Sequence, residues 1–173
     1  MLEQIGPKLA RQAHLLVFAS PRHDPLTREA LKQAGCDLPS FLVWAKDGHG
    51  VGDCKRSFGP EHECIVHASI GGAEIRLRKG SVFHYPRVRP HPHPTQKPVG
   101  LLAELIRATV DPGKLVCDPF AGVGSTLVAA VATGRNAWGC ELNPDWHTAG
   151  LQRLHDPVAE LAAETRNPEQ RAA

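Results

Sequence analysis

The chain has 173 residues, of which 42% are hydrophobic, and a formal net charge of +2 at pH 7. This length fits one domain, and the apolar content excludes a wholly disordered chain. The five cysteines are odd in number and include no Cys-x-x-Cys pair, which argues against a disulfide framework and a zinc knuckle. No signal peptide and no apolar run of about 20 residues is found, so we expect a soluble, cytoplasmic protein that binds neither membrane nor metal.

Three strands and one helix are predicted in the first 70 residues. The apolar run Leu15–Ala19 predicts a buried strand, and Leu26–Ala34 predicts a helix with Asp24 as its cap. Further strands are predicted at Phe41–Lys46 and Glu63–Ser69.

A basic, proline-rich segment follows these strands. Glu74 is the only acid between positions 74 and 97, and the stretch from Arg76 to Pro94 has four prolines and no clean period, so we expect a loop or insertion. Lys and Arg supply most non-specific affinity for DNA, although a solvated surface would have the same composition. The candidate phosphate-binding residues are Arg76, Arg78, Lys79, Arg87 and Arg89.

The second half of the chain alternates regularly between helix and strand. Pro98 suits the first turn of a helix, and apolar residues recur on one face from Val99 to Val110. The order predicts a parallel sheet with helices on both faces, and hence an α/β fold. Trp44 and Trp138 lie within predicted strands, and we expect both to be core or packing residues. The later elements are predicted at Leu115–Cys117, Ser125–Thr133, Asn136–Cys140 and Pro144–Leu154.

The segment from Val116 to Thr126 reads VCDPFAGVGST and is the sharpest motif of the chain. A strand runs into Asp118, a tight turn holds Gly122 and Gly124, and a helix begins at once. Glycine lets the backbone approach a ligand closely, and a helix N-terminus favours an anionic group. Glu141 ends the next strand, where an acid could accept hydrogen bonds from both hydroxyls of a ribose.

These residues favour a nucleoside cofactor over a merely structural turn. Two common nucleotide-binding motifs fit the sequence poorly. A P-loop would need a lysine before Ser125, and Gly124 stands there instead. A dinucleotide fingerprint would need a small residue where Leu127 stands, and it does not account for Asp118. A nicotinamide-dependent oxidoreductase is therefore the weakest of the functional hypotheses.

Three motifs resemble the DNA adenine-N6 and cytosine-N4 methyltransferases. They are HPTQKPV at positions 93–99, DPFAGVGST at 118–126 and GCELNP at 139–144. Their order resembles the permuted group, in which the cofactor motifs come last. The segments LVWAK at 42–46 and EHE at 61–63 also resemble the family's W-x-K strand and His-Glu pair. The resemblance covers about residues 15–154.

The resemblance implies a Rossmann-like sheet and S-adenosylmethionine as cofactor. Thr95, Lys97 and Pro98 would border the methionine end of that cofactor. Glu141 would hold the ribose, and Leu142 and Asn143 would flank the adenine. The floor of the site would be formed by Asp118, Phe120, Gly122 and Gly124, with Asp118 near the ammonium. The basic residues 75–92 occupy the place of a short target-recognition loop for double-stranded DNA.

One family motif is absent, so no catalytic residue is assigned. The family holds the flipped base with Asp/Asn/Ser-Pro-Pro-aromatic, and Ser20-Pro21-Arg22-His23 lacks both the second proline and the aromatic residue. The family places the strand that bears this motif between those predicted at Leu115 and Leu15, so the sheet is expected to be incomplete. A missing N-terminal fragment or a homodimer partner would complete it.

Two functional readings follow, which the upstream sequence would separate. In the first, residues 1–154 form a partial domain of a site-specific DNA methyltransferase of a restriction-modification type, and residues 155–173 form a helical or disordered Ala/Glu-rich tail. In the second, the chain is a catalytically inactive remnant or subunit that binds cofactor or DNA. The spacing of Glu63 and His67 after His62 does not fit a helical zinc motif, and the segment is predicted as a strand.

Overall fold

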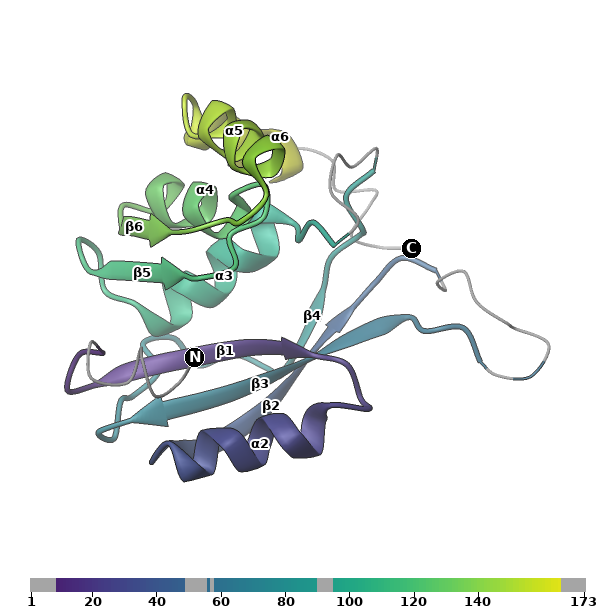
Figure 1. Cartoon of the computed structure of the whole chain (residues 1–173), viewed down its shortest axis with the longest axis vertical. Coiled ribbons are helices and arrows are strands. Elements are labelled where there is room, and N and C mark those ends of the chain that lie inside the picture. Colours follow the sequence, from purple (N-terminus) through teal and green to yellow (C-terminus); the bar gives the residue numbers. More distant parts are fainter. Residues whose placement is uncertain (1–8, 49–55, 57, 90–94, 166–173) are drawn as a thin grey trace. The chain divides into compact units, whose positions relative to one another are not determined.

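The computed structural model describes residues 9–48, 56, 58–89 and 95–165, which belong to two compact units. The first unit includes residues up to Ile75 together with Lys79–His84, and the second includes Arg76–Arg78 and all residues from Tyr85 onward. Each unit contains its own sheet (Figure 1). None of the helices in these described ranges is long and apolar enough to cross a membrane.

The first unit is a four-stranded sheet with α2 packed against it. The strand order is β1-β3-β2-β4, with β3 antiparallel to both β1 and β2, and β4 parallel to β2. A small core of Leu31, Cys36, Val66 and Ala68 lies where α2 packs on the sheet. The elements are β1 (Ala13–Ala19), α2 (Asp24–Gln33), β2 (Asp37–Ala45), β3 (His62–Ile70) and β4 (Val82–His84).

The strands and the helix predicted for this unit are confirmed, with four local differences. Every residue of β1, which is predicted as a buried strand, is only half-buried. Strand β2 begins at Asp37, four residues earlier than predicted, and its register shifts between Asp37 and Ser40, around Pro39. Proline has no N–H for the ladder and is tolerated in strands at such irregularities. Asp24 is the first residue of α2 rather than its cap, and its carboxylate pairs with Arg28. The basic segment is not entirely loop, because it contains β4.

Two motifs noted in the sequence meet through a salt bridge. Lys46 Nζ lies 2.6 Å from Glu63 Oε1 and 4.5 Å from the centre of the Trp44 ring. Trp44 is 2% exposed, as expected for a core residue. The W-x-K strand and the His-Glu pair therefore form one cluster that fixes β2 against β3.

A chain of polar side chains crosses the same sheet from β2 to β1. Ser40 Oγ lies 2.7 Å from His67 Nδ1, and His67 Nε2 lies 3.0 Å from His14 Nδ1. His14 Nε2 lies 3.3 Å from the carbonyl oxygen of Glu74, so it serves that carbonyl as a donor. His67 is buried, and burial together with the neighbouring His14 lowers its pKa.

The second unit is a parallel β5–β6 pair with helices packed around α4. Helix α4 packs on both strands, and α3 and α6 pack on α4 and on each other. All the elements predicted here are confirmed within a residue or two, and the tail contributes α6, while residues 166–173 lie outside the described ranges. The elements are α3 (Val99–Thr109), β5 (Leu115–Asp118), α4 (Ser125–Ala132), β6 (Asn136–Gly139), α5 (Pro144–Arg153) and α6 (Pro157–Thr165).

One face of the β5–β6 pair carries exposed apolar side chains, contrary to the prediction of cover on both faces. Leu115 is 57% exposed and Trp138 is 55% exposed, so of the two roles expected for Trp138 the core role is wrong. Both strands alternate exposed and half-buried residues, and the half-buried set includes Val116 and Ala137. In the described part of the chain, β5 pairs only with β6, and β1 pairs only with β3.

Candidate functional site

The glycine turn lies at the carboxyl end of β5, where ligands bind in open α/β sheets. Asp118 ends β5, and Gly124 caps α4 with a φ of +76°, a conformation that strains any residue with a Cβ. Gly122 also has a positive φ, of +54°. The turn is held by Gly124 N–H donating to Ala121 O at 2.8 Å, and by Ala121 N–H donating to Cys140 O at 2.9 Å.

Glu141 closes onto this turn from the end of β6. The Gly122 N–H donates to Glu141 Oε2 at 2.8 Å, and the Asn143 N–H donates to Glu141 Oε1 at 2.9 Å. The two motifs are thus joined into one structural feature.

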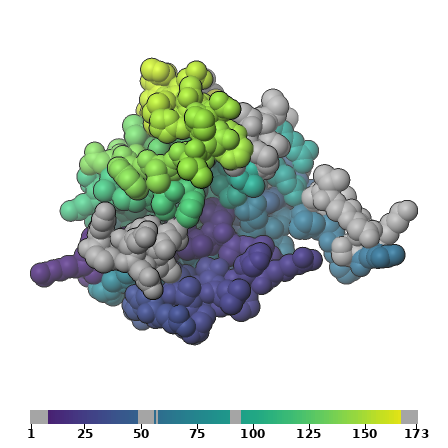
Figure 2. Space-filling view, in the orientation of Figure 1, coloured from purple at the N-terminus to yellow at the C-terminus, as the bar shows by residue number. Residues whose placement is uncertain are grey.

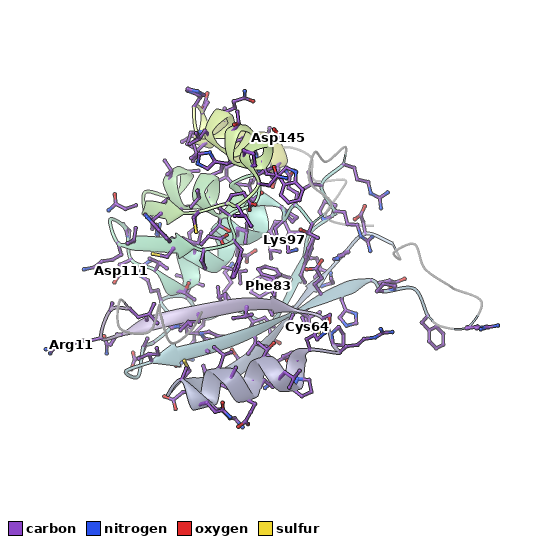
Figure 3. The ribbon with its side chains drawn as sticks, viewed as in Figure 1. Arg11, Cys64, Phe83, Lys97, Asp111 and Asp145 are labelled. Atoms are coloured by element: carbon purple, nitrogen blue, oxygen red, sulfur yellow. The ribbon has the colours of Figure 1, made fainter. Side chains whose placement is uncertain are left out.

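Asn143 begins the next helix. Its side-chain oxygen accepts from the N–H groups of Asp145 and Trp146, at 2.9 and 3.2 Å, which is an N-cap for α5. Figure 3 labels Asp145 at this first turn. This cap fixes the chain direction directly after Leu142, which is 99% exposed. The Asn143 side chain is therefore occupied in holding the helix start.

Asp118 and Phe120 lie side by side in the turn. The Phe120 N–H donates to Asp118 Oδ1 at 3.0 Å, which orients a half-buried carboxylate. Phe120 itself is 72% exposed. Two large apolar side chains, Phe120 and Leu142, thus stand in solvent next to the ends of neighbouring strands, a combination suited to a ligand with an apolar ring.

The residues before α3 form a compact turn of their own. Lys97 Nζ donates to the Thr95 carbonyl at 3.0 Å, and Pro98 is buried at the N-cap of α3. Figure 3 labels Lys97 near the start of that helix. Gln96 Oε1 is a buried acceptor with no hydrogen-bond partner in the described residues. An orphaned buried acceptor is costly unless a donor reaches it, so this turn fits a bound ligand that carries one.

The basic residues of this segment differ in their contacts and in their exposure. Arg76 pairs with Asp111 and donates to Arg107 O at 3.4 Å, while its N–H donates to Ala108 O at 2.7 Å. Arg76 therefore ties the segment to the end of α3. Arg78, Lys79 and Arg89 are exposed and Arg87 is half-buried, while residues 90–94 of the segment lie outside the described ranges.

Two residues that hold the glycine turn were not singled out from the sequence. A Cβ on Gly150 of α5 would lie 3.2 Å from the carbonyl carbon of Val123, so helix and turn touch backbone to backbone. Arg153, one turn further along α5, donates from Nη1 to Val123 O at 2.6 Å and to Ser125 Oγ at 3.0 Å. A glycine within a helical pattern is a signal for such close packing.

Comparison with known proteins identifies this arrangement. The parallel strands, the glycine turn and the acid at the end of β6 belong to an α/β fold of the Rossmann-like methyltransferase class. A sequence profile of the N6/N4 DNA methylases matches residues 78–151. Over these residues the chain is similar to this DNA methylase family.

Two curated relatives come from Escherichia coli strain K12. The DNA adenine methyltransferase YhdJ is 34% identical over 164 residues, covering 73% of this chain and 55% of the relative. YubD, which is named as a methylase, is 48% identical over 127 residues, covering 72% of this chain and 54% of the relative. The chain thus spans about half the length of these relatives.

The fold also matches solved structures. The crystal structure of the M1.HpyAVI-SAM complex matches with a TM-score of 0.79 at 22% identity, covering 88% of this chain and 79% of that chain. At this identity the likeness concerns the fold, which is confirmed as the α/β methyltransferase class. The roles predicted for individual site residues stay predictions.

Proposed function

We propose that this chain is part of a DNA methyltransferase that transfers a methyl group from S-adenosylmethionine to an exocyclic amine, N6 of adenine or N4 of cytosine. The observation that carries the proposal is the Glu141 carboxylate held 2.8 Å from the Gly122 nitrogen, at the carboxyl ends of two parallel strands. Ligands of open α/β sheets bind at this edge. The family that the chain resembles supports the choice of cofactor, and so does the fold that the chain shares with the M1.HpyAVI-SAM complex.

The residues present fit S-adenosylmethionine. When bound, this cofactor supplies an electrophilic methyl group on a sulfonium. Glu141 would accept from the ribose hydroxyls, and exposed Leu142 would flank the adenine next to Asn143. Thr95, Lys97, Pro98 and the orphaned Gln96 Oε1 would border the methionine end. The turn formed by Asp118, Phe120, Gly122 and Gly124 would be the floor, with Asp118 facing the ammonium.

The basic segment would contact DNA phosphates. Arg78, Lys79, Arg87 and Arg89 flank β4, and all but the half-buried Arg87 are exposed. Each Lys or Arg contact with a phosphate releases counterions on binding. Arg76 pairs with Asp111, so we propose that its part in DNA binding is to hold the basic segment in place. Neutralising Arg78 and Arg89 should reduce the slope of log affinity against log salt by roughly one each.

A second polypeptide segment would complete the partial domain of residues 1–154. Three observations support this. Leu115 and Trp138 are exposed, β5 pairs only with β6 among the described residues, and the chain spans about half the length of the curated relatives. We propose that the occupant is a strand followed by the Pro-Pro-aromatic tetrapeptide that the family resemblance implies, supplied by an upstream fragment. A second copy of this chain is the alternative that sedimentation of the purified protein would reveal.

Cofactor binding tests the first step of the proposal. Titration calorimetry should give one S-adenosylmethionine site on the wild-type chain and no detectable NAD binding. Asp118→Ala and Glu141→Ala should each abolish it, whereas Asp111→Ala, at the opposite end of β5, should retain it. Cofactor affinity that survives both site substitutions would refute the assignment.

Methyl transfer tests the second step. The chain mixed with an upstream fragment bearing the tetrapeptide should incorporate tritiated methyl groups into duplex DNA, and digestion to nucleosides would identify the base. A well-folded complex that binds cofactor and DNA but transfers no methyl group would instead favour an inactive binding subunit.

A further inference from the structure

Helix α3 has no acid of its own at its N-terminus. Pro98 at the N-cap makes no side-chain hydrogen bond, and the first turn contains no acidic residue. The first N–H groups of a helix need acceptors, and a negative charge there is favourable. This is also the helix that begins directly after the Thr95–Pro98 turn.

Glu164 of α6 supplies the missing acid from 64 residues away. The Gly100 N–H donates to Glu164 Oε2 at 2.8 Å, and the Val99 N–H also favours the ionised carboxyl. Burial raises the pKa of Glu164, and the two N–H groups oppose that rise. The cost of burying a carboxylate is thus partly offset by the helix end that it caps.

The same face of α6 reaches the glycine turn through a second acid. Glu160, one helical turn before Glu164, pairs with Arg153, and Arg153 donates to the Val123 carbonyl and to Ser125 Oγ. Residues four apart lie on one side of a helix. Helices α5 and α6 form one continuous yellow-green surface in the space-filling view (Figure 2).

We propose that α6 is a positioning element of the cofactor site, in which Glu164 fixes the Thr95–Pro98 turn through the start of α3 and Glu160 fixes the glycine turn through Arg153. This rests on the proposed function. We assign neither acid a contact with the cofactor, because the contacts of both are to Gly100 and Arg153. Their effect is to hold the Thr95–Pro98 turn and the glycine turn in place before the cofactor binds. Binding then does not have to order either turn.

Substitution of Glu164 tests this with two readouts. Glu164→Ala should speed hydrogen exchange at the Val99 and Gly100 amides of the ligand-free protein, and should weaken S-adenosylmethionine binding about tenfold. Glu164→Gln keeps an acceptor oxygen and should restore most of both. Thr165→Ala, a neighbouring exposed change in the same helix, is the matched control and should leave both unchanged.

The outcomes separate this inference from the proposed function. If the wild-type chain binds no S-adenosylmethionine, the proposed function fails and this inference with it. If the wild type binds and Glu164→Ala binds equally well while its Gly100 amide exchanges faster, α6 is merely structural and the inference alone is overturned. Glu164→Gln serves the same purpose if Glu164→Ala does not fold, since a Gln variant with exposed Val99 and Gly100 amides and unchanged affinity would also overturn it.

Discussion

Replacing Gly124 with alanine should damage the site much more than replacing Gly134, although the two glycines share a backbone conformation. Their φ angles are +76° and +77°, so each alanine would carry a left-handed strain of roughly 1–2 kcal/mol. Their surroundings differ. A Cβ at Gly134 meets nothing within 4 Å, whereas at Gly124 it would lie 3.3 Å from the Cα of Gly150.

The extra contact at Gly124 is with backbone, which cannot rotate away. Overpacking of this kind costs about 1–3 kcal/mol, so Gly124→Ala should be less stable than Gly134→Ala by that amount. The shift must be taken up by the glycine turn or by α5. We therefore expect Gly124→Ala to lose S-adenosylmethionine affinity by at least about tenfold, the equivalent of one lost hydrogen bond to a charged group.

Urea unfolding and titration calorimetry on the two variants measure these effects. Gly134→Ala, at the opposite end of β6 from the turn, should keep wild-type affinity despite its lower stability. Equal losses of stability and affinity in the two variants would refute the argument that the glycine turn is packed against α5.

The remaining predictions concern charge. The pKa of buried His67 is lowered, so below about pH 6.5 this histidine takes up a proton more readily in the unfolded chain than in the folded one. The free energy of unfolding should therefore decline with acidification. His67→Gln should flatten that decline in urea titrations. The pH dependence that Glu164 gives to stability has the opposite sign, because its pKa is raised. Its contribution to the free energy of unfolding is complete at low pH and is lost as the pH rises through the raised pKa. Glu164→Gln should remove this loss in melting curves taken across the acid range. Arg76→Ala should lower the free energy of unfolding by about 1 kcal/mol through its pair with Asp111, whereas Arg78→Ala should leave it within ~0.5 kcal/mol; equal effects would show that the Arg76 contacts carry no stability.

The local elements could be predicted because their signals are local. Hydrophobic periodicity and the Asp118 to Thr126 turn identify the β5–α4 unit, and the acid after β6 follows from its spacing to that turn. β4 was missed because a three-residue strand lying in a proline-rich segment gives no period, and it is stabilised by pairing with β2 rather than by its own sequence.

Contacts between distant segments could not be predicted in the same way. The exposure of Trp138 depends on what covers the sheet face, which a strand pattern does not encode. The ion pair of Arg76 with Asp111 and the cap of α3 by Glu164 each join residues that a single sequence leaves unrelated. The family resemblance identified the residues at the turn, but not α6, which lies beyond the resembling segment.

The proposed cofactor site is tested most directly by NMR, which can locate where the product of the cofactor binds on the chain. Titration of the isotope-labelled protein with S-adenosylhomocysteine should shift the amide signals of Gly122, Gly124 and the segment from Glu141 to Asn143, and leave Gly113 and Gly134, at the opposite ends of the same strands, unchanged. Saturable binding that shifts signals elsewhere and spares the glycine turn, or no binding at all, would contradict it.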